Sequence, residues 1–318
     1  MTDGGEQGRP HATRGLRAMA KLLRLSSTLT STILPRKLDH WVSHPRKPYS
    51  GRPPRRVRHK IDVRQADLSG WPVYEVSPKS VAPDALRGHV LYLHGGAYVL
   101  DIIPALHWPA IAKIATTLQR TVTVPIYPLA PEHTYREVYP FLLDVYRQVL
   151  QTHHPKSVAF MGESAGGGLA LGLCHALRAA GLPQPGDALL LSPWLHAALP
   201  DPGVAAVAAV DPILSPSVLR EAARHYAGGA SLDDPLISPS TVPLSGLPRI
   251  SILTGTHEVL NPDARAFRRR ANAEGVELGW YELDGGIHAW MFLPVGRNAR
   301  DAWDYIRTTV DEQAGEVR

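Results

Sequence analysis

The sequence predicts an α/β fold in which helices flank a mostly parallel central sheet, with a small helical cap. Short apolar runs that suit buried strands alternate with longer segments whose apolar residues recur at helical spacing. Such alternation is typical of parallel strands that are connected by helices on both faces of one sheet. Residues 195–248, rich in Ala, Pro and Ser, interrupt the alternation between two predicted strands and are expected to form the cap.

The elements before the interruption follow in a regular order. Apolar residues recur at helical spacing from Leu16 to Leu29, which predicts an amphipathic helix over residues 16–34. A proline-broken connector follows at residues 46–56. Strands are then predicted at 89–96, 121–128, 156–163 and 187–194, and helices at 105–120, 135–151 and 165–180.

After residue 248 the alternation resumes. Strands are predicted at 249–256 and 277–284, and helices at 264–274 and 299–312, while the interruption itself holds one helical segment at 215–227. We therefore divide the chain into four parts. These are a disordered basic arm (1–14), a cap helix with its connector (15–60), a core (61–194 and 249–318) and a cap insertion (195–248).

Composition excludes several classes of protein. Hydrophobic residues make up 44% and charged residues 20%, as in soluble globular proteins. No run approaches the roughly 18 apolar residues that a membrane span needs, so no integral membrane segment is expected. The apolar N-terminal stretch is broken by Lys21 and Arg24, which argues against a signal peptide. The single cysteine, Cys174, excludes an internal disulfide and favours a reducing compartment, so we expect a cytoplasmic protein.

Charge is unevenly distributed. Residues 1–60 hold 14 Lys and Arg against 3 Asp and Glu, in a chain whose net charge is only +5. A basic arm of this kind can contact anionic lipid or nucleic acid. Here the basic residues are scattered among Pro, Ser and His, and no nucleic-acid motif follows them. We interpret the segment as a solvated surface and expect no nucleic-acid partner.

Ser164 lies among glycines in FMGESAGGGLALGL, residues 160–173. The stretch 162–166 matches G-x-S-x-G, with a strand-like run before it and a helix of small residues after it. In that setting a sharp turn pushes the hydroxyl outward, and glycines two residues before and after the serine let strand and helix approach. The helix start adds free N–H groups near the hydroxyl. We interpret Ser164 as a nucleophile rather than as part of an ordinary tight turn.

A serine hydroxyl needs a base to take its proton. His288, in DGGIHAWMF (284–292), follows the last predicted strand, from which its loop can reach over Ser164. It is our general base and later general acid. His94 precedes the serine in the chain, and we expect it to hold a neighbouring loop by hydrogen bonds. His257 lies where the acid is expected.

The acid that orients His288 has three candidates. Glu258 lies two residues beyond the strand at 249–256, from which it can reach back over the sheet edge. Asp263 is better placed to cap the next helix or to interact with its dipole. Asp284 lies four residues before His288. We expect Glu258 to be the acid, with Asp263 and Asp284 as alternatives.

Backbone N–H groups are expected to bind the oxyanion of a tetrahedral intermediate. The strand predicted at 89–96 ends in Gly95 and Gly96, and Ala97 follows it; a loop with glycines can turn its amides toward the serine. The amide of Ala165, directly after the nucleophile, is the further expected donor.

With these residues assembled, the chain resembles the hormone-sensitive-lipase-like (bacterial family IV) serine esterases of the α/β-hydrolase superfamily, over roughly residues 85–315. The resemblance is carried by HGGA (94–97) for H-G-G-G, YPLAPEH (127–133) for Y-R-L-A-P-E, GESAGG (162–167) for G-D-S-A-G-G, and DPLISP (234–239). The chain departs from the commoner pattern where Glu258-Val259-Leu260 stands for D-P-L, which resembles the subgroup that uses glutamate.

The resemblance implies the α/β-hydrolase fold and an esterase that needs neither metal nor organic cofactor. Cap-covered members take short acyl chains and small apolar alcohols, so a small-molecule ester, such as an acetyl ester, is the expected substrate. Hydrolysis of a lactone or amide by the same triad is one alternative, and a non-catalytic ligand-binding member of the fold is another. A homodimer is compatible with this family. Five side chains that flank the motifs are expected to line the substrate pocket: Tyr98, Trp194, His196, Trp290 and Met291.

Overall fold

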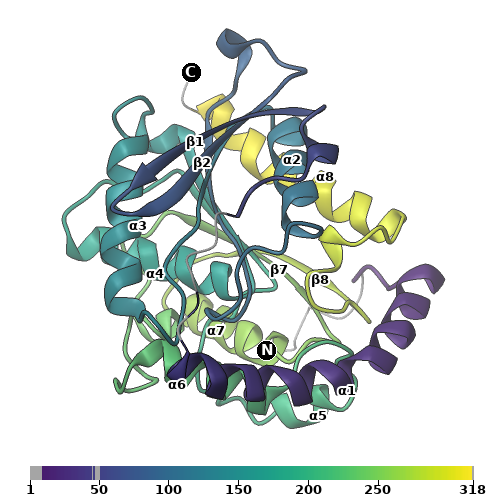
Figure 1. Cartoon of the computed structure of the whole chain (residues 1–318). Helices are drawn as coiled ribbons and strands as arrows, with labels where there is room; N and C mark the ends of the chain where they lie inside the picture. Colours follow the sequence, from purple (N-terminus) through teal and green to yellow (C-terminus); the bar gives the residue numbers. More distant parts are fainter. Residues whose placement is uncertain (1–8, 45, 47–50, 317–318) are drawn as a thin grey trace.

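The computed structural model describes residues 9–44, 46 and 51–316 and has one central sheet with helices on both faces (Figure 1). The sheet has eight strands in the order β1-β2-β4-β3-β5-β6-β7-β8. The strands are β1 (Ile61–Leu68), β2 (Trp71–Pro78), β3 (His89–Leu93), β4 (Thr121–Pro125), β5 (Val158–Glu163), β6 (Asp187–Leu191), β7 (Arg249–Gly255) and β8 (Gly279–Leu283).

Most of the sheet is parallel, as the sequence predicts. Only β1 with β2 and β2 with β4 pair antiparallel, whereas the five pairs from β4 to β8 are parallel. The main α-helices are α1 (Arg14–Ser43), α2 (His107–Leu118), α3 (Tyr135–Val149), α4 (Ala165–Ala179), α5 (Val204–Ala208), α6 (Pro216–Ala227), α7 (Asn261–Ala273) and α8 (Arg297–Glu316).

The period of two along each strand divides the core into two layers. Val90 and Tyr92 of β3 pack in the layer that holds side chains of α2 and α8. Leu91 and Leu93 point to the opposite layer, which holds side chains of α3, α4 and α7. Because both faces are covered, the central strands read as continuous apolar runs, and the prediction of an α/β fold with a mostly parallel sheet is confirmed.

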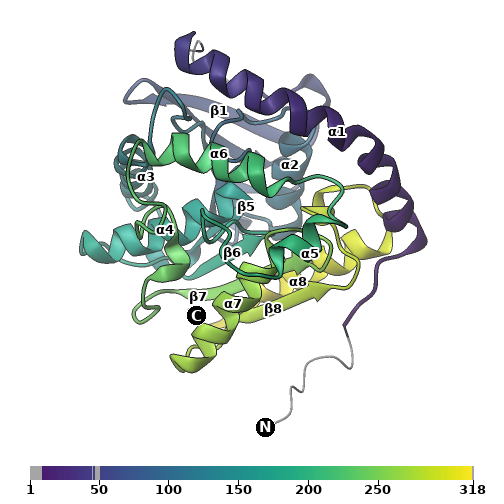
Figure 2. The same cartoon turned by 90° about the horizontal axis from the view of Figure 1, so that it is seen from below.

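The segment between β6 and β7 contains α5 and α6. Figures 1 and 2 show both helices beside α1, and α1 also packs on α6. The guanidinium of Arg24 donates to the carbonyl of Ala209, which lies just after α5. The helix predicted for residues 16–34 extends further than expected, to Ser43. In the described part of the chain, no helix combines the length and apolar character that crossing a membrane requires.

The start of the described chain differs from the expected disordered arm. Residues 1–8 of that arm lie outside the described residues, but residues 9–13 pack against the end of β8. The amide of Ala12 donates to the carbonyl of Asp284 (2.7 Å), and the amide of Thr13 donates to the Asn298 side chain (2.8 Å). Ala12 is buried, because these bonds draw the segment onto the sheet edge.

Cys174 lies in the middle of α4, between the sheet and α3. Its side chain is fully buried among apolar neighbours. Burial raises the pKa of its thiol. The residue is therefore part of the core, in agreement with its place inside a helix of small residues.

Candidate active site

Ser164 lies at a sharp turn between β5 and α4. Its backbone has φ 57° and ψ −123°, a conformation that L-residues rarely adopt and that signals local strain. The turn is held because the Ser164 amide donates to the carbonyl of Leu191 (2.9 Å). A Cβ at Gly162 would collide with the carbonyl of Gly166, and a Cβ at Gly166 with the carbonyl of Leu93. The glycines of G-x-S-x-G are therefore required by close backbone packing.

His288 and Glu258 meet at the carboxyl ends of the last two strands. The Nδ1–H of His288 donates to Oε2 of Glu258 at 2.8 Å, and both residues are buried. The other oxygen of Glu258 accepts from the Thr254 hydroxyl (2.7 Å) and the Gly255 amide (2.8 Å). Three hydrogen bonds thus fix the carboxylate, and the carboxylate in turn fixes the tautomer and orientation of the imidazole.

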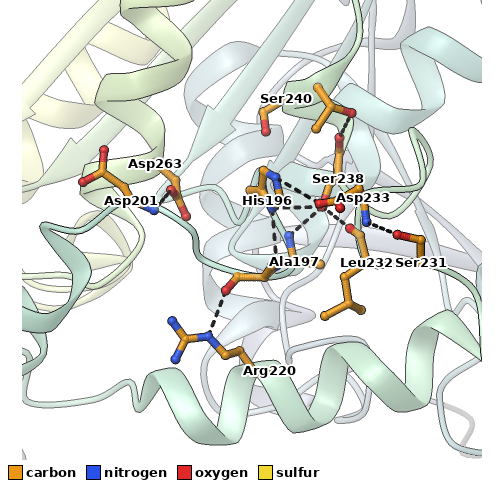
Figure 3. A network of polar contacts seen from close by, with 12 residues as sticks. His196, Ala197, Asp201, Arg220, Ser231, Leu232, Asp233, Ser238, Ser240 and Asp263 are labelled. Carbon is orange, nitrogen blue, oxygen red and sulfur yellow. Dashed lines mark hydrogen bonds and ion pairs between the residues drawn. The ribbon is translucent and has the colours of Figure 1, made fainter.

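The other two acid candidates lie elsewhere. Asp263, in the first turn of α7, accepts a hydrogen bond from the amide of Asp201 (3.1 Å), as Figure 3 shows. Asp284 pairs with His11 at 2.9 Å. Neither carboxylate has a hydrogen bond to His288 in the described part of the chain.

Electrostatics favour the protonated form of His288. Burial acts to lower the pKa of this imidazole, but the hydrogen bond to Glu258 and the negative charges of Glu258, Asp211 and Glu163 outweigh it. The pKa of His288 is raised above its usual 6.5 as a result. An imidazole with this environment is a stronger base than one in water.

The loop after β3 faces the serine with free amides. Gly96 and Ala97 have positive φ angles of 124° and 54°, which turn the loop sharply. Their amides and that of Ala165 have no hydrogen-bond acceptor among the residues that the structure describes. These three N–H groups are therefore free to donate to a bound ligand. Gly95 is not, because its amide donates to Oε1 of Glu163 at 2.5 Å.

Glu163, the residue before the serine, connects the turn at Ser164 to this loop. Its carboxylate also accepts from Nε2 of His107 (2.8 Å) and from the Tyr92 hydroxyl (2.7 Å). Burial acts to raise the pKa of Glu163, but His107 and these hydrogen bonds hold it below its usual value. Sequence reasoning missed this cluster, although Glu163 is the variable second position of G-x-S-x-G.

His94 contacts the same loop, the one that follows β3. Its ring stacks on Tyr127 with centroids 4.3 Å apart, and its Nδ1 contacts the carbonyl of Gly95. Burial lowers its pKa to about 4, so it is neutral at physiological pH. This environment fits the expected role of holding the loop and excludes a role as the mobile base.

Ser164 and His288 line one cavity of about 590 Å³. Its wall also includes Gly96, Ala97, Glu163 and Asp211. The cap contributes apolar side chains: Ala208, Ile213, Leu214, Val218 and Leu219. The loop before α2 contributes three more: Leu100, Ile103 and Leu106.

The five expected pocket residues do not line this cavity, and that part of the prediction is corrected: Tyr98, Trp194, His196, Trp290 and Met291. Four of them are buried in the core. Tyr98, for example, stacks on Tyr226 with ring centroids 4.0 Å apart. Large aromatic rings gain most from full burial.

His196 belongs to a second polar network (Figure 3), whose residue types are those of a Ser-His-Asp triad. Its Nδ1 lies 3.3 Å from the Ser238 hydroxyl, and its Nε2 lies 3.6 Å from Asp233. However, Ser238 is fully buried, and its hydroxyl donates to the carbonyl of Leu232 (2.6 Å). The network therefore holds the loop after β6 to DPLISP (234–239) and offers no nucleophile.

The comparisons with known proteins agree with this architecture. Residues 90–292 match a family described as the alpha/beta hydrolase fold. An acetyl-hydrolase of Streptomyces hygroscopicus is 33% identical over 70% of this chain and 76% of its own length. The crystal structure of EstE5, soaked with p-nitrophenyl butyrate, superimposes with a TM-score of 0.82 at 28% identity, covering 96% of this chain and 100% of that one.

A further solved structure identifies the branch of the alpha/beta hydrolase fold that the chain resembles. An esterase from the bacterial hormone-sensitive lipase family superimposes with a TM-score of 0.78 at 26% identity, covering 96% of this chain and 99% of the other. The sequence resemblance, the fold and these relatives lead to one assignment. The chain belongs to the alpha/beta hydrolase fold family, within its hormone-sensitive-lipase-like branch of carboxylic ester hydrolases.

Proposed function

We propose that this protein is a serine carboxylesterase with Ser164 as nucleophile, His288 as general base and Glu258 as the acid that orients it. The observation that carries the proposal is the cavity wall, which brings Ser164 together with an imidazole already bonded to a buried carboxylate. A nucleophile, a base and an orienting acid in this relation define the catalytic triad.

In the proposed reaction, the Ser164 oxygen attacks the ester carbonyl while Nε2 of His288 takes the hydroxyl proton. Glu258 stabilises the imidazolium, and the amides of Gly96, Ala97 and Ala165 bind the oxyanion. His288 then gives its proton to the leaving alcohol. A water molecule, deprotonated by His288, attacks the acyl-enzyme. As the second intermediate collapses, His288 returns this proton to the Ser164 oxygen and the acid is released.

The proposed substrates are short-chain acyl esters, acetyl esters among them, of small apolar alcohols. The cavity of about 590 Å³ is of the size that binds small molecules, and aliphatic side chains of the cap and of the loop before α2 form much of its wall. The name of the Streptomyces hygroscopicus relative, an acetyl-hydrolase, supports the acyl group.

The decisive experiment is hydrolysis of p-nitrophenyl esters by the wild type and Ser164→Ala. We expect the variant to lose on the order of 10⁵–10⁶ in kcat while its melting temperature stays unchanged. A panel of acyl chains from about two to twelve carbons, and the anilide that matches the best ester, define the substrate class. Turnover that survives in Ser164→Ala, or a preference for the anilide, contradicts the proposal.

A further inference from the structure

Asp211 brings a carboxylate from the cap to the wall of the catalytic cavity. It lies in the loop between α5 and α6, it is buried, and it lines the cavity together with Ser164 and His288. The triad and the oxyanion loop do not use it. Burial of a carboxylate is costly unless hydrogen bonds compensate for the lost water, so the partners of Asp211 indicate what it does.

The two oxygens of Asp211 bind two different parts of the molecule. Oδ1 accepts from the amides of Ile213 (2.8 Å) and Leu214 (2.9 Å), which folds the cap loop into a turn that begins at Asp211. Oδ2 accepts from the amide of Val259 at 2.8 Å. Val259 directly follows Glu258 in the chain, so one side chain joins the cap to the loop that carries the triad acid.

The residues at the two ends of this connection are parts of the site. Ile213 and Leu214 form the apolar wall of the cavity, and α6, which starts two residues later, supplies Val218 and Leu219. At the other end, Glu258 holds His288 at 2.8 Å. A shift of the cap relative to Val259 therefore changes the shape of the cavity and the position of the triad acid together.

We propose that Asp211 is a positioning residue that fastens the substrate-binding wall of the cap to the Glu258 loop and so sets the cavity and the triad in one fixed relation. This inference rests on the proposed function. It assigns the cap a part in catalysis beyond covering the cavity, because loosening the cap would disturb the acid as well.

Charge adds to the geometric argument. The acidic groups that face His288 are Glu258 from the loop after β7, Asp211 from the cap and Glu163 from β5, and Glu163 is itself paired with His107. All three carboxylates favour the imidazolium form. Removing the charge of Asp211 should therefore lower the pKa of His288, whereas lengthening its side chain should not.

Two variants separate position from charge. Asp211→Asn keeps the shape of the side chain but replaces one of its two acceptor oxygens by an NH₂ group. That NH₂ group then faces a backbone N–H and cannot accept from it. Asp211→Glu keeps the charge but shifts the carboxylate by one methylene group. The matched control is Asp233→Asn, which removes one carboxylate from the same cap insertion at a side chain that is 74% exposed.

With p-nitrophenyl esters, we expect both Asp211 variants to raise KM, and to lower kcat/KM by roughly 10-fold or more, because a buried amide loses its acceptor. The acid limb of kcat/KM should move to lower pH in Asp211→Asn only, because only this variant removes the negative charge. Asp233→Asn should match the wild type. If Asp211→Asn also matches the wild type in KM, in kcat and in the position of the acid limb of kcat/KM, the proposal is wrong.

A second readout is independent of turnover. In the Ser164→Ala background, NMR titration of the His288 imidazole, assigned by its loss in His288→Gln, should give a lower pKa with Asp211→Asn than without it. An inactive wild type with this NMR shift would contradict the proposed function alone. An active wild type without it would contradict the role of Asp211. If both Asp211 variants fail to fold, Asp211 serves the fold only, and the proposal is also wrong.

Discussion

Protonation of His288 sets the acid limb of the pH profile in the proposed reaction. The base is competent only when neutral, so activity rises as pH increases through its pKa. Burial opposes the charged form, yet Glu258, Asp211 and Glu163 together raise that pKa above 6.5. The acid limb of kcat/KM should therefore lie above pH 6.5 in the wild type.

We expect Glu258→Gln to move this limb to lower pH and to reduce kcat by about 10²–10⁴, because the imidazolium loses its counter-charge and the imidazole its fixed tautomer. Stopped-flow or steady-state pH profiles measure both effects. Asp284→Asn is the control, since Asp284 is half exposed and bonded to His11. A limb that moves in Asp284→Asn and stays in Glu258→Gln would refute the assignment of the acid.

For single residues, the sequence alone led to the triad that we propose, but not to the side chains that line the cavity. Ser164, Glu258 and His288 each follow a strand of the parallel sheet. The carboxyl ends of parallel strands lie at the same end of the sheet, so the order of strands alone brings the three residues to that end. The cavity wall instead comes from Ile213, Leu214 and other aliphatic residues of the cap. Their side chains look the same in the sequence whether they face a core or a cavity.

Among the elements, α7 begins with a carboxylate in an unusual environment. One oxygen of Asp263 accepts from Asp201, while the other is buried without a partner among the described residues. Burial raises the pKa of Asp263 to about 6. The native state then holds a proton between about pH 4 and 6 that the unfolded chain releases, so this group weakens the fold as pH rises through that window.

We therefore expect Asp263→Asn to stabilise the protein by roughly 1–3 kcal/mol at pH 8 and to have no such effect near pH 4, where the wild-type carboxyl is already neutral. Thermal melts at both pH values measure this difference, and esterase activity should persist. The exposed Asp62→Asn serves as control. A stabilisation that is equal at both pH values would contradict the argument from protonation.

Strands β3 to β8 were predicted from the sequence, whereas β1 and its neighbour β2 were not. β1 carries IDVRQADL, and most of its side chains are exposed, so no continuous apolar run identifies it. The end of α1 was also missed, because Pro35 and two basic residues follow the apolar stretch, and the later Val42 is exposed. Apolar periodicity identifies buried faces, and β1 and this end of α1 bury few of the side chains that the structure describes. In β2, Pro72, Glu75 and Pro78 interrupt the apolar run.

For the whole molecule, the start of the described chain packs against the end of the edge strand β8. The segment 10–13 is bonded to Asp284, and the Asn298 side chain of α8 both accepts from Thr13 and donates to the carbonyl of His11. Arg9 pairs with the buried Glu282 at 3.1 Å. These contacts link the two ends of the chain through the last strand.

A protein that lacks residues 1–13 should melt several degrees below one that lacks residues 1–8, because hydrogen bonds worth about 1 kcal/mol each are lost. Scanning calorimetry of the two truncated proteins beside the full chain tests this prediction. Equal melting temperatures for all three would show that the segment adds nothing to stability.

The thiol buried in the middle of α4 gives the protein an internal reporter. Cys174 is the only cysteine, and its surroundings exclude solvent and disfavour the thiolate. A maleimide or an aromatic disulfide reagent will thus label a molecule only after its interior has opened. The labelling rate measures the frequency of such openings, without any introduced probe.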